Sequence, residues 1–414
     1  MALGLTVAAL GTGQATAATT SGHQAAKPQL TPTSFALQTS GYGTRVQGGD
    51  IPGKSGTSAY QVISCTNDAG KAKTNHQAES ELPGLGTLSA VTTKVWTTQK
   101  AGVTSSWSRH SVGAVRLSDS PLGTLLIDAV TTTARAFHDA KGFHTETNTD
   151  IGGLTFKPAA GPAQTLPIPA PGNPTEIPGF GTVTIGHSNV HKHRHSAGAY
   201  ANGLKVELTA SHSTVRIAHA FAKISDGIIS GLFSGSAAGL SGKLGGETLD
   251  LGRNPLSVMP CKGTGGKVQQ KTLAGASGQD QVTATGLHNE QRAEQTQKKA
   301  WGFERSTVAS FKLGDQLSIK AIVGQANVTR TAAGLNRSIK GTQVGTITAN
   351  GQDQTFPDTD TITIPGVAKI ERGVVTKTPG GIKVVGVRIT LLDGSGGVID
   401  LATAKLRIAK PSKH

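Results

Sequence analysis

The sequence contains little charge, few aromatic rings and only two cysteines. Of its 414 residues, 16% are charged and 4% are aromatic. Such sparse charge excludes a helical bundle. The shortage of aromatic rings leaves little that could stack on bases, so we expect no nucleic-acid partner. No stretch approaches the roughly 18 apolar residues that a transmembrane helix needs, so we also expect no transmembrane segment.

Glycine is abundant instead, and many apolar residues alternate along the chain. The 55 glycines and 18 prolines indicate many turns. One alternating set is Leu125, Ile127 and Ala129, and a second is Val215, Ile217, His219 and Phe221. Period two predicts strands, and each set is expected to lie on one face of its strand. The sequence therefore predicts an all-β protein.

The chain carries an excess of positive charge. Forty Lys and Arg against 25 Asp and Glu give a formal net charge of +15. The charge is dispersed, and residues 405–414 form one of its densest basic stretches. Such a surplus attracts polyanions at low salt, so we expect anionic cell-envelope polymers as partners.

The N-terminal segment predicts export. Residues 1–17 carry no charge, contain an apolar run and end on Ala15-Thr16-Ala17. This pattern is typical of the second half of a secretory signal peptide. Residues 18–31 continue with a polar composition that predicts disorder. We expect a secreted, extracellular protein, in part associated with the cell wall.

The chain repeats itself once. Matching residues recur in the same order while their separation shrinks from 196 to 178, as loop deletions in a second copy would produce. The matched pairs include Cys65 with Cys261, Ala129 with Ala321, Ile177 with Ile364, and Gly203 with Gly381. A period this long indicates tandem domains rather than a solenoid.

We place the first copy at residues 32–224 and the second at 232–410, with a linker at 225–231 and a tail at 411–414. The proline-rich segment 158–178 has its counterpart at 349–365, so we interpret it as a loop of the first copy. The predicted fold is two tandem antiparallel β-sandwich-like domains related by internal duplication.

Several motifs of the first copy resemble the choice-of-anchor P family of exported actinobacterial proteins. The motifs are, in chain order, residues 42–46, 62–65, 82–88 with 91–93, 142–145 and 177–183. The resemblance implies a β-rich secreted or surface protein. It implies no catalytic activity.

The two cysteines occupy equivalent positions in the two copies. In an oxidising compartment, Cys65 and Cys261 could form a disulfide between the domains. This pairing requires the copies to face each other there, with Cα atoms within about 7 Å. Two buried free thiols are the alternative, and we favour them because of this requirement.

Two other patterns suggest ligand chemistry but are better explained otherwise. Gly48 followed by Gly53-Lys54-Ser55 matches a phosphate-binding loop, yet a strand rather than a helix is expected next, so a hairpin loop is favoured. His187, His191, His193 and His195 form a cluster, but neighbouring cations would repel a metal ion. We interpret the cluster as a solvated basic hairpin.

No catalytic constellation emerges from the sequence. Acidic residues are sparse, and carboxylates such as Asp128 and Asp139 could serve glycoside hydrolysis only if they were paired in space. We therefore predict a non-catalytic protein without cofactor or metal, which acts through surface interactions. The alternative is a secreted carbohydrate-binding or carbohydrate-acting protein with a site between the two copies. The oligomeric state stays open.

Overall fold

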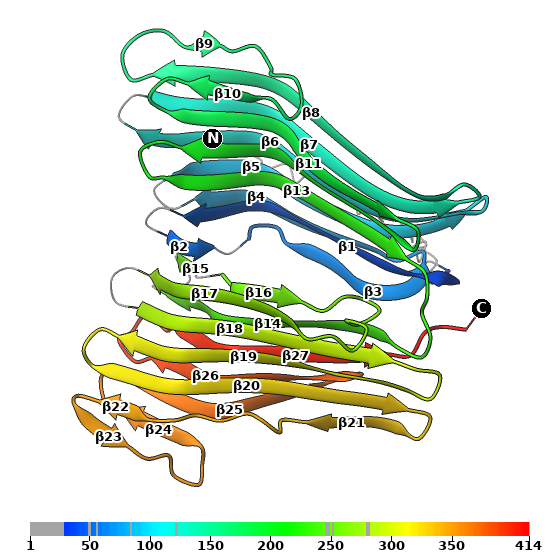
Figure 1. Ribbon diagram of the computed structural model, residues 1–414. Helices are drawn as coiled ribbons and strands as arrows, with labels where there is room; N and C mark the ends of the chain where they lie inside the picture. The colour runs from blue at the N-terminus through cyan, green and yellow to red at the C-terminus, as the bar shows by residue number, and fades with distance from the viewer. Residues whose placement is uncertain are drawn as a thin grey trace, which may run out of the picture.

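Strands account for all the regular structure that is described. The computed structural model describes residues 29–413 except 49–50, 55–56, 83–84, 121–122, 245–248, 251 and 279–281. Within these residues there is no helix, and four antiparallel sheets of six or seven strands hold the chain (Figure 1). The all-β prediction is confirmed. The signal segment 1–17 and most of the segment 18–31 lie outside the described residues.

Two sheets build the first sandwich, the upper one in Figure 1. Sheet A runs in the order β10 (Pro174–Ile177), β11 (Gly181–His193), β12 (Ser196–Leu208), β13 (Ser213–Ser225), β1 (Thr31–Gly48) and β2 (Ile51–Lys54), and β3 (Gln61–Ala69) also pairs with β1. Sheet B runs β4 (Ala72–Leu82), β5 (Gly86–Lys100), β6 (Val103–Ser120), β7 (Gly123–Asp139), β8 (Gly142–Pro158) and β9 (Gln164–Thr165).

The second sandwich repeats this order. Sheet C runs β15 (Leu249–Asp250), β14 (Leu232–Leu244), β27 (Val398–Ala409), β26 (Gly381–Leu391), β25 (Ala368–Thr378) and β24 (Thr361–Ile364), with β16 (Asn254–Val258) on β14. Sheet D runs β17 (Gln269–Gly278), β18 (Val282–Gln295), β19 (Lys299–Leu313), β20 (Leu317–Thr331), β22 (Ile347–Ala349) and β23 (Gln352–Gln354), with β21 (Gly334–Ser338) on β20. In each half the first strand pairs with the last. The proline-rich segment 158–178 leads from sheet B to sheet A, and 349–365 leads from D to C.

In each long strand, the pairing with the neighbouring strands skips one position. These skipped positions lie side by side across the sheet. Tyr42 pairs with His219 and Thr44 pairs with Ile217, whereas Gly43 and Ala218 between them stay out of the ladder. The same gap crosses both sheets of both sandwiches and includes a glycine or alanine in each long strand. Between β5 and β6 it is wider and also takes in Val91 and Val112. We call these glycine and alanine positions the bend row. They are Ala78, Ala90, Gly113, Ala129, Gly152, Gly186, Gly203, Ala218 and Gly43 in the first half, and Gly239, Ala274, Gly286, Ala309, Ala321, Gly373, Gly386 and Ala402 in the second.

The bend row reverses the faces of every strand that crosses it. An extra residue moves all later side chains of a strand to the opposite face. In β13, Ile217 is fully buried before the bend and Ala220 after it, so His219 and Phe221 point outward. The prediction that these two share a face with Val215 and Ile217 is therefore wrong. In β7 likewise, Ala129 leaves the buried face and Val130 takes its place.

Backbone geometry explains why the row holds only small residues. Ala129, Ala218, Ala321 and Ala402 have φ between 44° and 56°, in the left-handed region that side chains disfavour. A Cβ built on Gly203 would lie 3.0 Å from the Ala218 Cβ and 2.5 Å from the Val130 Cγ1 of the opposite sheet. The neighbouring strand and the facing sheet therefore both exclude a larger side chain at Gly203.

The bend row also corrects the alignment of the two copies. Gly203 lies opposite Ala218, and its counterpart opposite Ala402 is Gly386. The sequence match of Gly203 with Gly381 is therefore displaced by five residues. The β25–β26 hairpin is four residues shorter than the β11–β12 hairpin, which is a smaller deletion than the sequence match implied.

Each sandwich has an apolar core on one side of the bend row and a more polar interior on the other. In the polar part, the Ser108 hydroxyl donates to the Ser40 carbonyl across the sheets, and burial lowers the pKa of His110 to about 3. Glu304 takes the place of Ser108 in the second sandwich. It is fully buried, neither carboxyl oxygen has a hydrogen-bond partner, and burial raises the pKa of Glu304 well above its usual value.

Paired substitutions in β13 test the strain at the bend row. Ala218 and Ala222 are both fully buried, but only Ala218 has a positive φ, of 56°. We expect Ala222→Gly to destabilise the protein by about 1 kcal/mol. In Ala218→Gly, relief of the left-handed alanine, worth about 1–2 kcal/mol, offsets that loss. Urea unfolding measures both, and an equal loss in the two variants would contradict a strained Ala218.

Candidate anion-binding cleft

The two sandwiches are joined by a disulfide. Cys65 of β3 and Cys261, which follows β16, are bonded, with Cα atoms 5.3 Å apart. The preference for two free thiols is therefore wrong. It assumed that equivalent positions of the two copies would not meet. They do meet, because the β1–β3 edge of the first sandwich faces the β14–β16 edge of the second (Figure 1).

The surroundings of the disulfide are apolar and come from both copies. Cys65 and Cys261 form a small buried cluster with Ala36 of β1 and Leu232 of β14. Beside it the C-terminal segment is tied to β3. The Asn67 side chain donates to the Ser412 carbonyl at 2.8 Å and accepts from the Ser412 amide at 2.9 Å. The junction is thus fixed by covalent, apolar and polar contacts.

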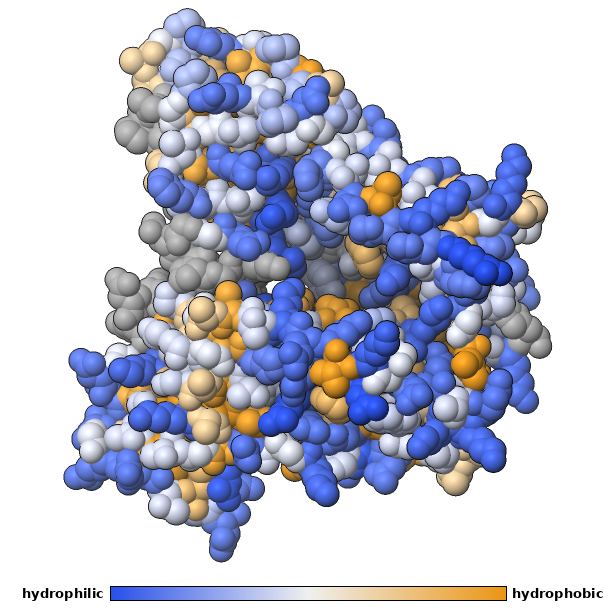
Figure 2. Space-filling view, viewed as in Figure 1, coloured by the Kyte–Doolittle hydropathy of each residue, from blue (hydrophilic) through white to orange (hydrophobic). Residues whose placement is uncertain are grey.

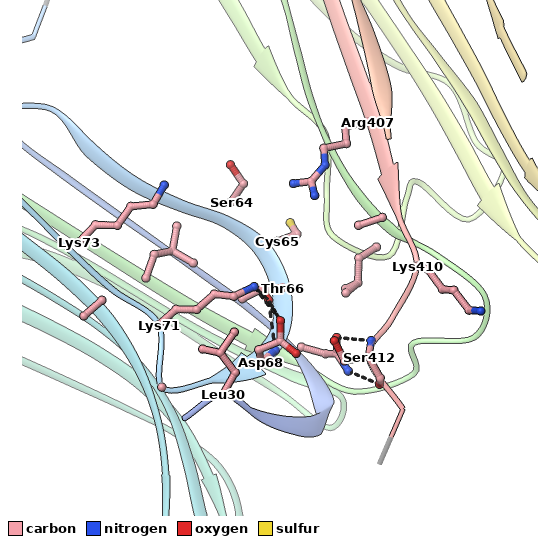
Figure 3. Close-up of a pocket in the computed structure, with 16 residues that line it drawn as sticks. Leu30, Ser64, Cys65, Thr66, Asp68, Lys71, Lys73, Arg407, Lys410 and Ser412 are labelled. Atoms are coloured by element: carbon pink, nitrogen blue, oxygen red, sulfur yellow. Dashed lines mark hydrogen bonds and ion pairs between the residues drawn. The ribbon is translucent and has the colours of Figure 1, made fainter. Parts of the chain in front are cut away.

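A cleft opens beside this junction. It has a volume of about 460 Å³, and both copies contribute to its lining. Among the described residues that line it, four side chains are cationic, Lys71, Lys73, Arg407 and Lys410, and one, Asp68, is a carboxylate. In Figure 3, Lys73 and Arg407 extend toward Ser64 from opposite sides, whereas the amine of Lys410 points outward at the rim. The cleft is therefore a concentration of positive charge.

The one acidic group is already neutralised within the cleft. The Lys71 amine lies 2.7 Å from the Asp68 carboxylate, and the Thr66 hydroxyl donates to it at 3.2 Å. Partial burial works to raise the pKa of Asp68, but the hydrogen bonds from Lys71, Ser412 and Thr66 outweigh it and lower that pKa. The charges of Lys73, Arg407 and Lys410 are left without a counter-ion among the described residues.

Further cations stand behind Arg407. The Arg407 Nε donates to the Pro379 carbonyl, and the Arg337 Nε to the Gly381 carbonyl, so backbone oxygens orient both side chains. Burial lowers the pKa of Arg330, and the charges of Arg337 and Arg407 lower it further. Figure 2 shows the surface hollowed between the two sandwiches, with hydrophilic and apolar residues both present at its edge.

The histidine cluster does not form a common site. His191 and His193 are exposed on β11, and His187 faces the Tyr200 ring. His195, in the following turn, lies 3.0 Å from the Asp226 carboxylate. Among the residues that the structure describes, no three His, Cys, Asp or Glu side chains gather as a metal site would require.

The remaining motifs are also separated in space. Ile51–Lys54 of the phosphate-loop pattern forms β2, antiparallel to β1, and its Ser55 lies outside the described residues. Asp128 and Asp139 stand eleven residues apart on β7, which puts them on the order of 30 Å apart along the strand. They cannot flank one glycosidic bond.

Sequence reasoning identified one wall of the cleft and missed the other. The basic stretch 405–414 supplies Arg407 and Lys410. Lys71 and Lys73 were not singled out, although they stand close to Cys65 in the sequence. Two lysines two apart at the start of a strand are an ordinary exposed pattern, and only the packing of the two copies brings them to Arg407.

No protein-family model matches the chain, and no curated protein matches it either. The described part of the chain contains no helix that is long and apolar enough to span a membrane.

The pKa of Asp68 leads to a pH-dependent stability. Because folding lowers this pKa, the ionised carboxylate stabilises the protein above the usual carboxyl range, and that contribution disappears as the pH falls through the folded-state value. The Asp68 side chain is 14% exposed, so we expect Asp68→Asn to cost on the order of 1 kcal/mol at pH 7. Urea unfolding at pH 7, 5 and 3 should show this difference shrinking toward zero. A difference that is constant over this range would contradict the assignment.

Proposed function

We propose that this protein is a non-catalytic protein of the cell envelope or the extracellular medium, which binds anionic envelope polymers through the cleft between its two copies. The cleft carries the proposal, because it gathers cations from both copies around one carboxylate that is already neutralised. The net charge of +15 supports it by attracting polyanions over a longer range.

Two observations support a place outside the cytosol. Disulfides persist in oxidising compartments and are rare in cytosolic proteins, and both cysteines of the chain are bonded to each other. The signal-like segment 1–17 and the resemblance to choice-of-anchor P proteins favour export as well. Both stay predictions from the sequence.

A carbohydrate-acting cleft has less support. Glycoside hydrolysis ordinarily uses two carboxyl groups that flank the scissile bond, whereas Asp68 is the only carboxylate in the cleft lining. No aromatic side chain lines the cleft either, so a neutral sugar would have no ring to pack against. The lining is better suited to a charged chain than to an uncharged glycan.

Polymer binding is tested with charge-removing variants. We expect the full chain to bind poly(glycerol phosphate) at low salt and more weakly as salt screens the charges. Replacing Lys73, Arg407 and Lys410 together with glutamine should weaken binding by about tenfold or more. The matched control replaces the exposed Lys141, Lys298 and Lys340 with glutamine, which removes the same charge outside the cleft. Equal losses in both variants would show that net charge, not the cleft, is responsible.

Localisation is tested by fractionating cells that make the protein. We expect it in the envelope fraction at low salt and in the medium at high salt, because screening weakens contacts between exposed charges. Immunodetection in each fraction measures the distribution. Protein that stays in the cytosol would refute export, and protein found wholly in the medium at both salt concentrations would refute retention by charge.

A further inference from the structure

A second, smaller hollow lies on the outer face of sheet A. It has a volume of about 210 Å³ and spans β11, β12 and β13. It shares no lining residue with the cleft at the junction. The side chains that bound it include Asn189, His191, His193, Tyr200, Phe221 and Lys223.

A glycine forms the floor of this hollow. Gly198 of β12 pairs with His191 on one side and Lys223 on the other. A Cβ built on Gly198 would meet no atom closer than 3.9 Å, so nothing in the packing demands glycine here. Glycine inside a strand costs stability and often marks a place where a ligand approaches the backbone. The space above Gly198 is therefore available to a ligand.

Two aromatic rings form one wall. Tyr200 and Phe221 are direct cross-strand partners, and both point outward because the bend row has reversed their strands. The Tyr200 ring packs near two imidazoles, with centroids 6.2 Å from His187 and 5.8 Å from His219. The side-chain amide oxygen of Asn202 (Oδ1) lies 2.8 Å from the His219 Nδ1 and holds that ring in place. The Tyr200 ring of this wall is thus held by contacts with His187 and His219.

A cation stands beside this wall, because Lys223 follows Phe221 by two residues on β13 and pairs with Gly198 of the floor. Lys223 is half-buried and forms no ion pair with any described carboxylate. Burial lowers the pKa of Lys223, and the nearby charge of Lys262 lowers it further. None of the described residues that line the hollow is Asp or Glu. A partly desolvated, unpaired cation is costly, and an anionic group bound beside it would offset that cost.

We propose that the hollow over Gly198 binds a single acidic sugar unit, with its ring against Tyr200 and Phe221 and its carboxylate at Lys223. Aromatic walls with a few placed polar groups are typical of small-ligand sites. The hollow is smaller than typical ligand pockets of about 300–1,000 Å³, so it suits one sugar unit rather than a longer chain. Asn189 and Ser196 of the lining can bond to ring hydroxyls.

Ligand titration of the full chain, followed by NMR, tests the proposal. We expect glucuronate to bind saturably and glucose at least about tenfold more weakly, because a hydrogen bond to a charged group contributes about 1.5–3 kcal/mol. Acetate and inorganic phosphate should show no saturable binding, since neither offers a sugar ring. Equal binding of glucose and glucuronate would refute the role of Lys223. Binding of acetate or phosphate as tight as that of glucuronate would show a simple anion site instead.

Variants locate the binding. Lys223→Met removes the charge but keeps the length of the side chain, and it should weaken glucuronate by about tenfold while leaving glucose unchanged. Gly198→Thr fills the floor and should abolish binding of both sugars, with Gly198→Ser as a smaller second variant. Ser188→Thr, on the opposite face of β11, is the matched control and should change nothing. Thermal unfolding verifies that each variant is folded, and unchanged binding in folded Gly198 variants would overturn the proposal.

These tests are separate from the polymer-binding test. The monosaccharide probes and the Gly198 and Lys223 variants leave the cleft at the junction intact. The cleft variants in turn leave the hollow intact. Failure of one proposal therefore does not decide the other.

Discussion

The architecture depends on the bend row, the level at which every long strand takes up one extra residue. A single strand could not do this alone, because its later side chains would change faces while those of its neighbours did not. The interruption must therefore cross a whole sheet, and the facing sheet must follow. Left-handed alanines such as Ala218 alternate with glycines such as Gly203, since each Cβ needs the space that the adjacent glycine leaves. The close approach of strands at the bend row therefore explains why glycine and alanine occupy it.

The bend row also determines which side chains lie on the outer and inner faces of each sheet. It places Tyr200 and Phe221 on the outside of sheet A, where they bound the hollow over Gly198. Inside, it separates the apolar core from a part in which polar groups are buried. Ser108 satisfies its hydroxyl there with a backbone carbonyl. Glu304, at the same place in the second copy, has no such partner. The copies have thus kept the backbone while their interiors diverged.

The sequence was sufficient for the fold class and for most of the duplication, because alternation and repeated motifs are local or in order along the chain. It was insufficient for the faces of β7 and β13, since an alanine gives no sign that its φ is positive. It was also insufficient to predict that the two cysteines form a disulfide or that Lys71 and Lys73 line the cleft. Cys65, Lys71 and Lys73 acquire their roles only from the second copy, and no local pattern specifies how two domains pack.

The disulfide shows that the two copies pack through equivalent positions. Cys65 and Cys261 are equivalent, and so are Ala36 and Leu232 beside them. Contact between equivalent positions is the property of a twofold interface, in which each partner offers the same patch to the other. The segments that follow the last strand of each copy also contact the other copy, through different residues: Ser412 bonds to Asn67 of the first copy, and the backbone at 229–231 donates to Gln295 of the second. Arg407 in the cleft and Lys223 in the hollow are likewise equivalent, each five residues beyond its left-handed alanine. A duplication that packs in this way places equivalent strand positions at two different surfaces, and the residues around Arg407 and Lys223 otherwise differ.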